Sequence, residues 1–233
     1  MTVSTNHKKN SDVLVIIPAY NEAESIERVV DELITGFPQF DYVVVTDGPT
    51  DGTDEICRRR GYNAVFLPKN LGLTGCFQNG MKYAKSLDYS YAVQFDGDGQ
   101  HRPEYIAPMA AKCAEGYDIV QGSRFLNKDS AKMEPLRSFG AWLIRTSIRM
   151  KTGVRMTDPT CGMRMYGKNI IEKFATESGM SPEPDTVSRL VNEGAKYAEV
   201  PVKVVERTAG ESYLSPGNAA KYMKRILRSI MES

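Results

Sequence analysis

The chain has 233 residues, of which 41% are hydrophobic and 25% charged, the ordinary composition of one soluble globular domain with a substantial core. Its net charge of +1 gives no broad positive field, so nucleic acid is not an expected partner. Two histidines exclude a histidine-rich metal site. Four cysteines without a Cys-x-x-Cys pair predict buried thiols in a reducing compartment, with neither a disulfide framework nor a zinc site.

Targeting and membrane-crossing segments are not expected. The first strongly apolar run, residues 13–17, is too short for a signal peptide and lacks a processing site. No run approaches the roughly 20 apolar residues that are needed to span a bilayer. We therefore expect a cytoplasmic protein, either soluble or peripheral at the cytoplasmic face of a membrane.

The first half of the chain alternates apolar runs with amphipathic segments. Short apolar, β-branched runs predict strands at residues 13–17, 42–46, 64–67, 91–95 and 118–121. Amphipathic segments between them predict helices at residues 24–34, 53–60, 72–87 and 105–115. Continuous apolar strands that alternate with helices are typical of a parallel sheet covered on both faces. The sequence therefore predicts an α/β fold with a mostly parallel central sheet.

The second half is less regular. Helices are expected at residues 136–151 and 185–193, and extended segments at 163–166 and 199–205. We divide the chain into a flexible N-terminus (residues 1–11), one α/β domain (residues 12–215) and a basic amphipathic C-terminal helix (residues 216–233).

The last helix, residues 218–231, has an apolar stripe on one side and lysines and arginines on the other. Two interpretations follow. The stripe docks on the domain or on a second copy of the chain, which we prefer and which leaves a homo-oligomer open. Alternatively, residues 218–231 lie on an anionic membrane surface as a peripheral contact.

Polar residues follow five of the predicted strands. In open α/β sheets, ligands bind beyond the carboxyl ends of the strands, so these residues are the candidates for a site. The five segments are Pro18-Ala-Tyr-Asn-Glu22, Asp47-Gly-Pro-Thr-Asp-Gly-Thr53, Asn70-Leu-Gly-Leu-Thr-Gly75, Asp96-Gly-Asp-Gly-Gln-His101 and Gly122-Ser-Arg-Phe125. We expect all five to meet at one polar rim.

The segment Asp96-Gly97-Asp98 directly follows a strand. Residues two apart on an extended backbone point the same way, so both carboxylates reach one point. With the amide oxygen of Gln100, they suit a hard cation, Mg²⁺ or Mn²⁺, completed by water or phosphate. Asp and Gly are common in turns, so this spacing alone is weak. Its place at a strand end, in line with the other polar segments, favours a metal site.

The first two strand ends suggest a nucleotide site. Asp47, at a strand end, is placed to accept hydrogen bonds from a base, and Pro18 and Tyr20 would form an apolar wall beside it. Glu22 reaches either the base or the ribose, or serves as an acid at a helix start. Asp51 caps the following helix or binds ligand, and these two interpretations stand even.

Five motifs in this order resemble glycosyltransferase family 2, especially its branch of dolichol-phosphate and bacterial polyprenyl-phosphate sugar transferases. The resemblance covers roughly residues 13–213, and five ordered motifs make it highly specific. Four of them are the segments 18–22, 47–53, 96–101 and 122–125 above, and the fifth is Arg207-Thr-Ala-Gly-Glu-Ser212.

This resemblance implies a GT-A fold, an inverting mechanism and a nucleotide-diphosphate sugar donor, a UDP- or GDP-sugar. It implies that Asp47 contacts the base, that Asp96, Asp98 and Gln100 surround the metal, and that Arg207 meets the diphosphate. Gly97, between the two aspartates, belongs with them to the donor-binding residues. Arg124 and Arg137 match positions that grip an acceptor phosphate in the polyprenyl branch.

Two departures from the family pattern matter, and the second weakens the case for a lipid-phosphate acceptor. The usual acidic pair after the second strand is Thr46-Asp47 here, and Tyr213 stands where the polyprenyl branch often has a lysine. Meanwhile Asp185 opens a helix in the region where relatives that act on hydroxyls carry their base. It is either that base or an ordinary acid at a helix N-terminus.

We therefore expect an inverting, metal-dependent glycosyltransferase of envelope glycan synthesis, whose acceptor is a polyprenyl phosphate or a lipid-linked saccharide. One alternative is a transferase to a saccharide hydroxyl, with Asp185 as base. A nucleotidyltransferase would need a Gly-rich, basic loop after the first strand, which this chain lacks. A non-catalytic regulator that binds nucleotide sugars is the alternative of another class.

Overall fold

The computed structural model describes residues 2–4, 8–126, 135–204 and 216–232. Side chains are described in all of these except residues 2–4, 135–137 and 216–220. Arg207 and Tyr213, two positions singled out above, lie outside the described residues.

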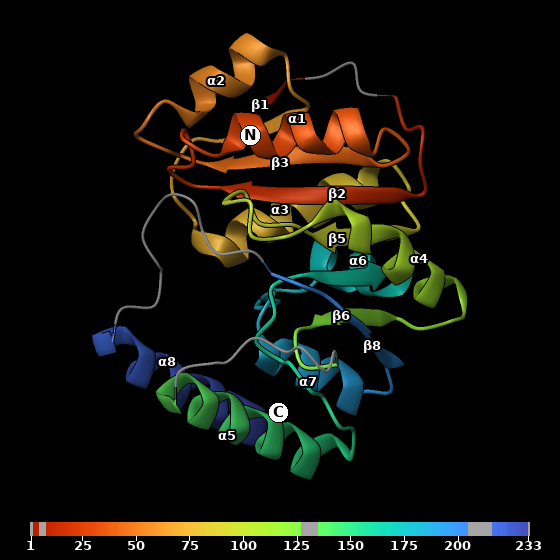
Figure 1. The fold of residues 1–233 in the computed structure, drawn as a ribbon, viewed down its shortest axis with the longest axis vertical. Coiled ribbons are helices and arrows are strands. Elements are labelled where there is room, and N and C mark those ends of the chain that lie inside the picture. The colour runs from red at the N-terminus through yellow and green to blue at the C-terminus, as the bar shows by residue number, and fades with distance from the viewer. Residues whose placement is uncertain (1, 5–7, 127–134, 205–215, 233) are drawn as a thin grey trace.

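One sheet runs through the molecule (Figure 1). Within the described residues it has eight strands, in the order β1-β4-β3-β2-β5-β7-β6-β8. The strands are β1 (Thr2–Ser4), β2 (Val13–Ala19), β3 (Asp41–Asp47), β4 (Ala64–Leu67), β5 (Tyr91–Gln94), β6 (Ile119–Ser123), β7 (Arg164–Gly167) and β8 (Tyr197–Pro201). Neighbouring pairs are parallel except at β1, which pairs antiparallel with β4, and at β7, which pairs antiparallel with both β5 and β6.

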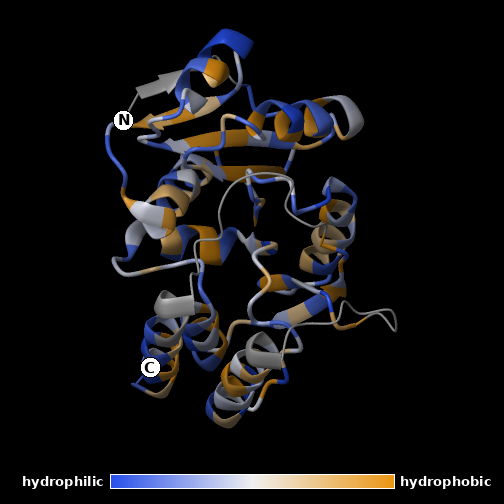
Figure 2. Cartoon of the chain, turned by 60° about the vertical axis from the view of Figure 1, so that its left-hand side comes forward, coloured by the Kyte–Doolittle hydropathy of each residue, from blue (hydrophilic) through white to orange (hydrophobic). Residues whose placement is uncertain are grey.

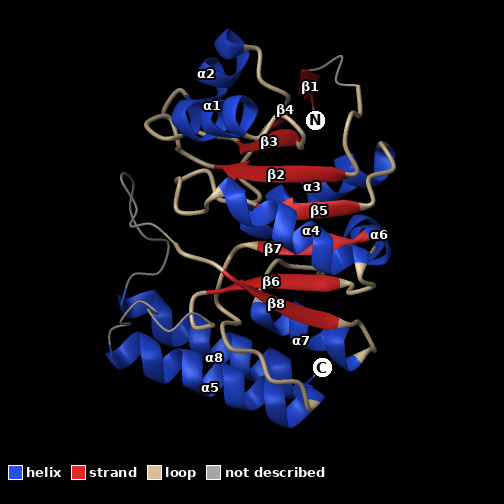
Figure 3. Cartoon of the chain, turned by 45° about the vertical axis from the view of Figure 1, so that its right-hand side comes forward, coloured by secondary structure: helices blue, strands red, loops and turns tan. Residues whose placement is uncertain are grey.

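Helices cover both faces of the sheet (Figures 1 and 3). One face is covered by α1 (Ile26–Gly36), α2 (Thr53–Arg60) and α4 (Ile106–Ala114), which follows the short 3-10 helix η1 (Pro103–Tyr105). The other face is covered by α3 (Gly72–Ser86), α5 (Pro135–Thr152), α6 (Lys168–Thr176), α7 (Pro184–Asn192) and α8 (Pro216–Glu232). The predicted α/β fold with a mostly parallel sheet and helices on both faces is confirmed.

The apolar run of β2 explains this layering. Leu14 and Ile16 belong to the core on one face, Val15 and Ile17 to the core on the other, and all four are fully buried. A strand side-chain period of two sends alternate residues to opposite faces, so a continuous apolar strand needs a cover on each side. Hydropathy colouring shows the same concentration of apolar residues in the strands and on the helix sides that face them (Figure 2).

Three features of the structure were not predicted from the sequence pattern, and the first two are elements. Strand β1 pairs with β4 inside the segment expected to be flexible, and helix α6 follows β7. The third is the antiparallel direction of β7, which has a consequence for the site. Because β7 runs against its neighbours, its start lies at the edge where β5 and β6 end, so the residues before Arg164 join the rim.

The C-terminal helix packs on the domain. Ile226 and Ile230 of α8 are fully buried in the core that α5 and α7 also build, and the two long helices α5 and α8 lie side by side (Figures 1 and 3). The apolar stripe of residues 218–231 is thus used inside the molecule, which is the docking that we preferred. Among the helices of the described residues, none is long and apolar enough to cross a membrane.

Candidate functional site

A pocket of about 600 Å³ opens at the polar rim. Its wall combines the start of α3, the end of β5, the turn that follows β5, the segment before β7, the start of α7 and one side of α8. The polar and charged residues among its lining are Thr74, Gln94, Asp96, Gln100, His101, Arg124, Thr160, Arg164, Glu183, Tyr222 and Arg225. Three of the predicted site residues, Asp96, Gln100 and Arg124, therefore share one cavity.

Asp96 is held in place by its own turn. The backbone N–H of Asp96 donates to His101 Nδ1 at 3.0 Å, so the neutral imidazole carries its proton on Nε2, which lies 3.5 Å from Asp96 Oδ2. Gln94 donates to the other carboxylate oxygen at 3.4 Å. His101 is nearly fully buried, whereas one third of the Asp96 side chain is exposed. The carboxylate is thus oriented from behind and open toward the pocket.

Gly162, in the segment before β7, closes the other side of this carboxylate. A Cβ at position 162 would lie 3.0 Å from Asp96 Oδ2 and 3.2 Å from His101 Cε1. That spacing is tighter than an ordinary contact, so a larger residue at position 162 would push the Asp96 carboxylate or the His101 ring out of place.

Asp98 occupies a more interior position than Asp96. Its side chain is 3% exposed, and its Oδ1 accepts the backbone N–H of Gln100 at 2.9 Å. Asp98 thereby holds the turn that presents Gln100 to the pocket. Gly97 between the two aspartates packs against β2, because a Cβ there would lie 3.1 Å from the carbonyl oxygen of Pro18.

The donor atoms at this turn suit a hard divalent cation. Asp96, Asp98 and Gln100 offer two carboxylates and an amide oxygen, which Mg²⁺ and Mn²⁺ both accept. In the part of the chain that the structure describes, no cluster of three or more His, Cys, Asp or Glu side chains could hold a metal. The set is therefore incomplete on its own. It fits a cation whose remaining ligands are water and the oxygens of a bound diphosphate.

Asp47 links the nucleotide side of the rim to the pocket wall. Its buried carboxylate accepts the backbone N–H of Leu71 at 2.8 Å, and Leu71 and Gly72 begin the pocket wall at the start of α3. Burial raises the pKa of Asp47, and the backbone N–H groups of Leu71 and Gly72 oppose that rise only in part. The turn needs Gly48, with φ of +61°, because a Cβ there would collide with the backbone of Lys69 and Asn70.

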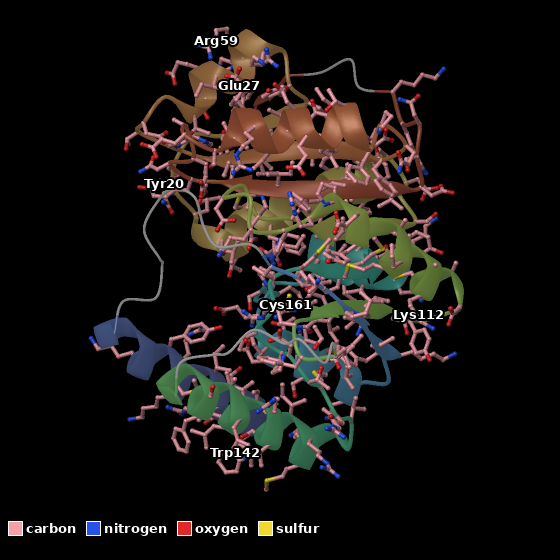
Figure 4. All side chains as sticks on the ribbon, viewed as in Figure 1. Tyr20, Glu27, Arg59, Lys112, Trp142 and Cys161 are labelled. Atoms are coloured by element: carbon pink, nitrogen blue, oxygen red, sulfur yellow. The ribbon has the colours of Figure 1, made fainter. Side chains whose placement is uncertain are left out.

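The other predicted nucleotide contacts lie beside β2. Tyr20 is 47% exposed and lies at the outer edge of the rim (Figure 4). The Glu22 carboxylate accepts a hydrogen bond from Ser25 Oγ at 2.7 Å, at the start of α1. Glu22 therefore takes part in the helix start, the second of its two predicted roles.

Asp51 holds the start of α2. Its Oδ1 accepts the backbone N–H and the hydroxyl of Thr53, and its Oδ2 accepts the N–H of Ala23. Burial would raise the pKa of Asp51, but these hydrogen bonds outweigh burial and lower it. All of these contacts are made within the protein, so they favour the capping role over ligand binding.

Arg124 reaches the pocket from the end of β6 with a fixed orientation. Its Nε and Nη2 donate to the two carboxylate oxygens of Asp158 at 2.6 and 2.8 Å, and Nη2 also donates to Thr160 at 3.0 Å. The Asp158 side chain is fully buried, whereas 27% of the Arg124 side chain is exposed. Hydrogen bonding to Asp158 raises the pKa of Arg124, so the guanidinium stays charged.

Asp185 is less well placed than Asp96 or Arg124. It lies in the first turn of α7 and is 9% exposed, and its Oδ1 has no hydrogen-bond partner among the described residues. Its neighbours Glu183 and Pro184 line the pocket. Arg137 lies in the first turn of α5, where side chains are not described, and Arg207 is outside the described residues.

Sequence reasoning missed several residues that build the pocket. Arg164 is 2% exposed and clamps two loops by donating to the carbonyl oxygens of Pro159 and Pro182, each at 2.7 Å. Glu183, Tyr222 and Arg225 also line the cavity. An Asp-Pro-Thr-Cys-Gly run before a short strand was the available signal for residues 158–162. It was missed because that strand was not expected to run antiparallel.

Comparison with known proteins identifies the family. The profile of Glycosyl transferase family 2 matches residues 14–175, more than half of the chain. The chain is 30% identical to Polyprenol monophosphomannose synthase of Mycolicibacterium smegmatis, covering 91% of this chain and 84% of that protein. It is 30% identical to Undecaprenyl-phosphate mannosyltransferase of Micrococcus luteus, covering 93% of each.

Solved structures share the fold. Mannosyl-3-phosphoglycerate synthase of Rubrobacter xylanophilus has a TM-score of 0.69 at 14% identity, over 94% of this chain and 72% of that one. Glucosyl-3-phosphoglycerate synthase of Mycobacterium tuberculosis, solved with Mn²⁺, uridine diphosphate and phosphoglyceric acid, has a TM-score of 0.66 at 17% identity, over 94% and 77%. These neighbours have the GT-A-like fold that the motifs implied. With the family profile matched along the sheet and its rim, the chain belongs to glycosyltransferase family 2 and is a glycosyltransferase.

Proposed function

We propose that this glycosyltransferase moves a sugar from a nucleotide-diphosphate donor to a polyprenyl phosphate, in a metal-dependent reaction that inverts the anomeric configuration. The observation that carries the proposal is the 30% identity, over 93% of both chains, to a protein named Undecaprenyl-phosphate mannosyltransferase. A role in envelope glycan synthesis at the cytoplasmic face of the membrane follows from such an acceptor. A lipid-linked saccharide is the second acceptor within the same proposal.

The donor is expected to lie along the rim. Its base would lie near Asp47, Pro18 and Tyr20, and its diphosphate would lie at the Asp96-Gly97-Asp98 turn. A divalent cation bound by Asp96, Asp98 and Gln100 would supply positive charge that stabilises the leaving diphosphate. Arg207, outside the described residues, is proposed to add a further positive charge there.

The acceptor phosphate supplies its own nucleophile. One of its oxygens attacks the anomeric carbon from the side opposite the diphosphate, the bond from that carbon to the diphosphate oxygen breaks, and the configuration inverts. An anionic phosphate needs no general base, only cations that position it. Arg124, oriented by Asp158 and exposed to the pocket, is a group of this kind.

A hydroxyl acceptor would require a base, for which Asp185 was the candidate. Asp185 is almost fully buried, while Glu183 and Pro184 beside it line the cavity. Burial of Asp185 therefore argues against Asp185 as the base of a hydroxyl acceptor.

The test uses purified protein, Mn²⁺, labelled UDP- and GDP-sugars and undecaprenyl phosphate in detergent. Label transferred to the lipid fraction is the expected result. Undecaprenol, the same lipid with a hydroxyl in place of the phosphate, is the matched control and is expected to receive none. Transfer to undecaprenol but not to its phosphate would favour the hydroxyl reaction, and donor binding without transfer would favour a non-catalytic regulator.

A further inference from the structure

The C-terminal helix contributes an arginine to the pocket. Arg225 and Tyr222 of α8 both line the cavity, and the Arg225 guanidinium lies 5.2 Å from the centre of the Tyr222 ring. Arg225 Nη2 donates to both carboxylate oxygens of Glu183, each at 2.8 Å. Glu183 precedes the first turn of α7 and lines the same cavity. One ion pair therefore joins α8 to α7 across the pocket wall.

The arginines that line the pocket differ in how firmly they are held. Arg124 is paired with Asp158, whose side chain is fully buried, and Arg164 is itself buried on two backbone carbonyls. Breaking either contact would leave a buried charge or polar group without a partner, which is costly. In the Arg225–Glu183 pair, by contrast, 53% of the arginine side chain and 19% of the glutamate side chain are exposed. A pair whose arginine is half exposed separates more easily than a buried pair, because water solvates the arginine when the contact opens.

This difference selects Arg225 as the cation that an anionic ligand can recruit. A phosphate monoester offers two to three oxygens to the planar guanidinium and carries more charge than a carboxylate. When the phosphate takes the place of the Glu183 carboxylate on Arg225, a stronger charge-assisted contact replaces a weaker one. Glu183 remains partly exposed and can be hydrated after the exchange.

We propose that Arg225 binds the phosphate of the acceptor, and that Glu183 occupies Arg225 as a competing carboxylate until the acceptor arrives. Helix α8 is then part of the acceptor site as well as part of the core. The inference rests on the proposed function in one respect, namely that the acceptor carries a phosphate monoester. That phosphate belongs either to a lipid or to a soluble molecule, and the experiment separates the two sources.

Two substitutions test the exchange because they have opposite expected effects. Arg225→Ala removes the cation and should raise the KM for the acceptor by about tenfold or more, the size expected for a hydrogen bond to a charged group. Glu183→Gln removes the competing charge and should lower that KM by about two- to fivefold, the strength of an exposed ion pair. A pair with a purely structural role predicts the same direction of change for both variants, since each breaks the same contact.

Arg228→Ala is the matched control. Arg228 lies on the same helix and pairs with Glu232 at 2.6 Å, but both side chains are largely exposed and neither lines the pocket. Its acceptor KM should match that of the unsubstituted protein. Arg225→Lys, which keeps the charge without the planar fork, should fall between Arg225→Ala and the unsubstituted protein.

The measurements are initial transfer rates against undecaprenyl phosphate and against 3-phosphoglycerate, with donor affinity determined separately by calorimetry in Mn²⁺. Binding of undecaprenyl phosphate and of inorganic phosphate is also measured directly, so that a result is obtained even without transfer.

Opposite shifts of the acceptor KM for Arg225→Ala and Glu183→Gln, with donor affinity unchanged, would support the proposal. The acceptor that the protein prefers then identifies the source of the phosphate. KM shifts in the same direction for both variants, or phosphate binding that survives Arg225→Ala, would overturn the proposal while leaving the proposed transfer reaction intact. If the unsubstituted protein does not bind the donor at all, the proposed function itself is contradicted.

Discussion

Asp47 is the buried carboxylate that the proposed function assigns to the nucleotide base. It lies at the end of β3, 2% exposed, and its contacts are backbone N–H groups at the start of α3. Burial raises its pKa, which means that the folded protein holds its charged form less favourably than the unfolded chain does. An unfavourably buried charge is common in binding sites, where the bound ligand donates hydrogen bonds to it.

Replacing Asp47 by Asn should therefore separate stability from binding. A carboxyl whose folded pKa is raised contributes stability below its ordinary pKa of about 3.9 and loses that contribution as pH rises through the folded value. At pH 7, Asp47→Asn should raise the free energy of unfolding, and this gain should fade below about pH 4. Nucleotide-diphosphate affinity should fall about tenfold. Urea unfolding at both pH values and calorimetry measure the two effects, and a destabilised variant with normal affinity would contradict this account.

The Arg124–Asp158 pair contributes to folding stability and also orients a residue of the pocket. Because Asp158 is fully buried, its removal strands the guanidinium of Arg124 in a half-buried position. Asp158→Ala should lower the free energy of unfolding by about 3–5 kcal/mol. Asp12→Ala is the control, because Asp12 is 73% exposed in its pair with Lys9 and its loss should cost less than about 1 kcal/mol. Urea unfolding of both variants measures the difference. Equal decreases in the free energy of unfolding would contradict the claim that burial of the pair makes its loss costly.

At the scale of elements, the sequence predicted strands and helices well where one pattern dominates. The apolar run at residues 13–17 of β2 is one example, and the stripe of α1 formed by Ile26, Val29, Val30 and Leu33 is another, since all of these residues are buried. The polar rim was predictable too, because parallel strands place their carboxyl ends together. The segment before β7 was not predicted as part of the site. Strand direction depends on pairing with β5 and β6, which no local pattern records.

The ion-pair partners of the site residues could not be predicted from the sequence either. Arg124 was singled out, but its partner Asp158 is 34 residues away, and only the fold brings them together. The same holds for Arg225 and Glu183, 42 residues apart. Charge composition shows that partners exist, while their assignment depends on the tertiary structure.

Helix α5 carries the clearest candidate for a lipid contact. Phe139 and Trp142 are more than half exposed and stack with their ring centres 5.9 Å apart, and the last turn carries Arg149 and Lys151. Trp142 points outward from α5 (Figure 4). Exposed aromatics beside cations are typical of surfaces that bind anionic lipid. We propose that α5 takes the membrane contact that was the alternative interpretation of residues 218–231, where Ile226 and Ile230 are already buried in the core.

Trp142→Ser should reduce binding to vesicles that contain anionic phospholipid by about tenfold, with no loss of thermal stability, because the side chain contacts solvent. Ile34→Ser, a similarly exposed apolar position on α1, serves as the control and should bind like the unsubstituted protein. Vesicle co-sedimentation measures both. Equal vesicle binding by Trp142→Ser and Ile34→Ser would contradict the proposal that α5 contacts the membrane.

At the scale of the whole molecule, the fold arranges its chemistry along one edge. The ends of β3, β5 and β6 place Asp47, the Asp96-Gly97-Asp98 turn and Arg124 on the same side of the sheet, and α7 and α8 close the pocket. In the proposed function the base lies at β3, the diphosphate at β5, and the acceptor at β6 and α8, which is the order of these strands across the sheet. The central claim is that Asp96 stands at the metal–diphosphate position of this series.

Calorimetry of UDP and GDP binding with and without Mn²⁺ tests that claim most directly. Asp96→Asn is compared with Asp88→Asn, an exposed aspartate that pairs with Lys168 and does not line the pocket. The account predicts that one of the two nucleotides binds the unsubstituted protein and Asp88→Asn in a Mn²⁺-dependent way, and that Asp96→Asn or removal of Mn²⁺ weakens binding by about 100-fold or more. Nucleotide binding that is indifferent to both Mn²⁺ and Asp96 would contradict it.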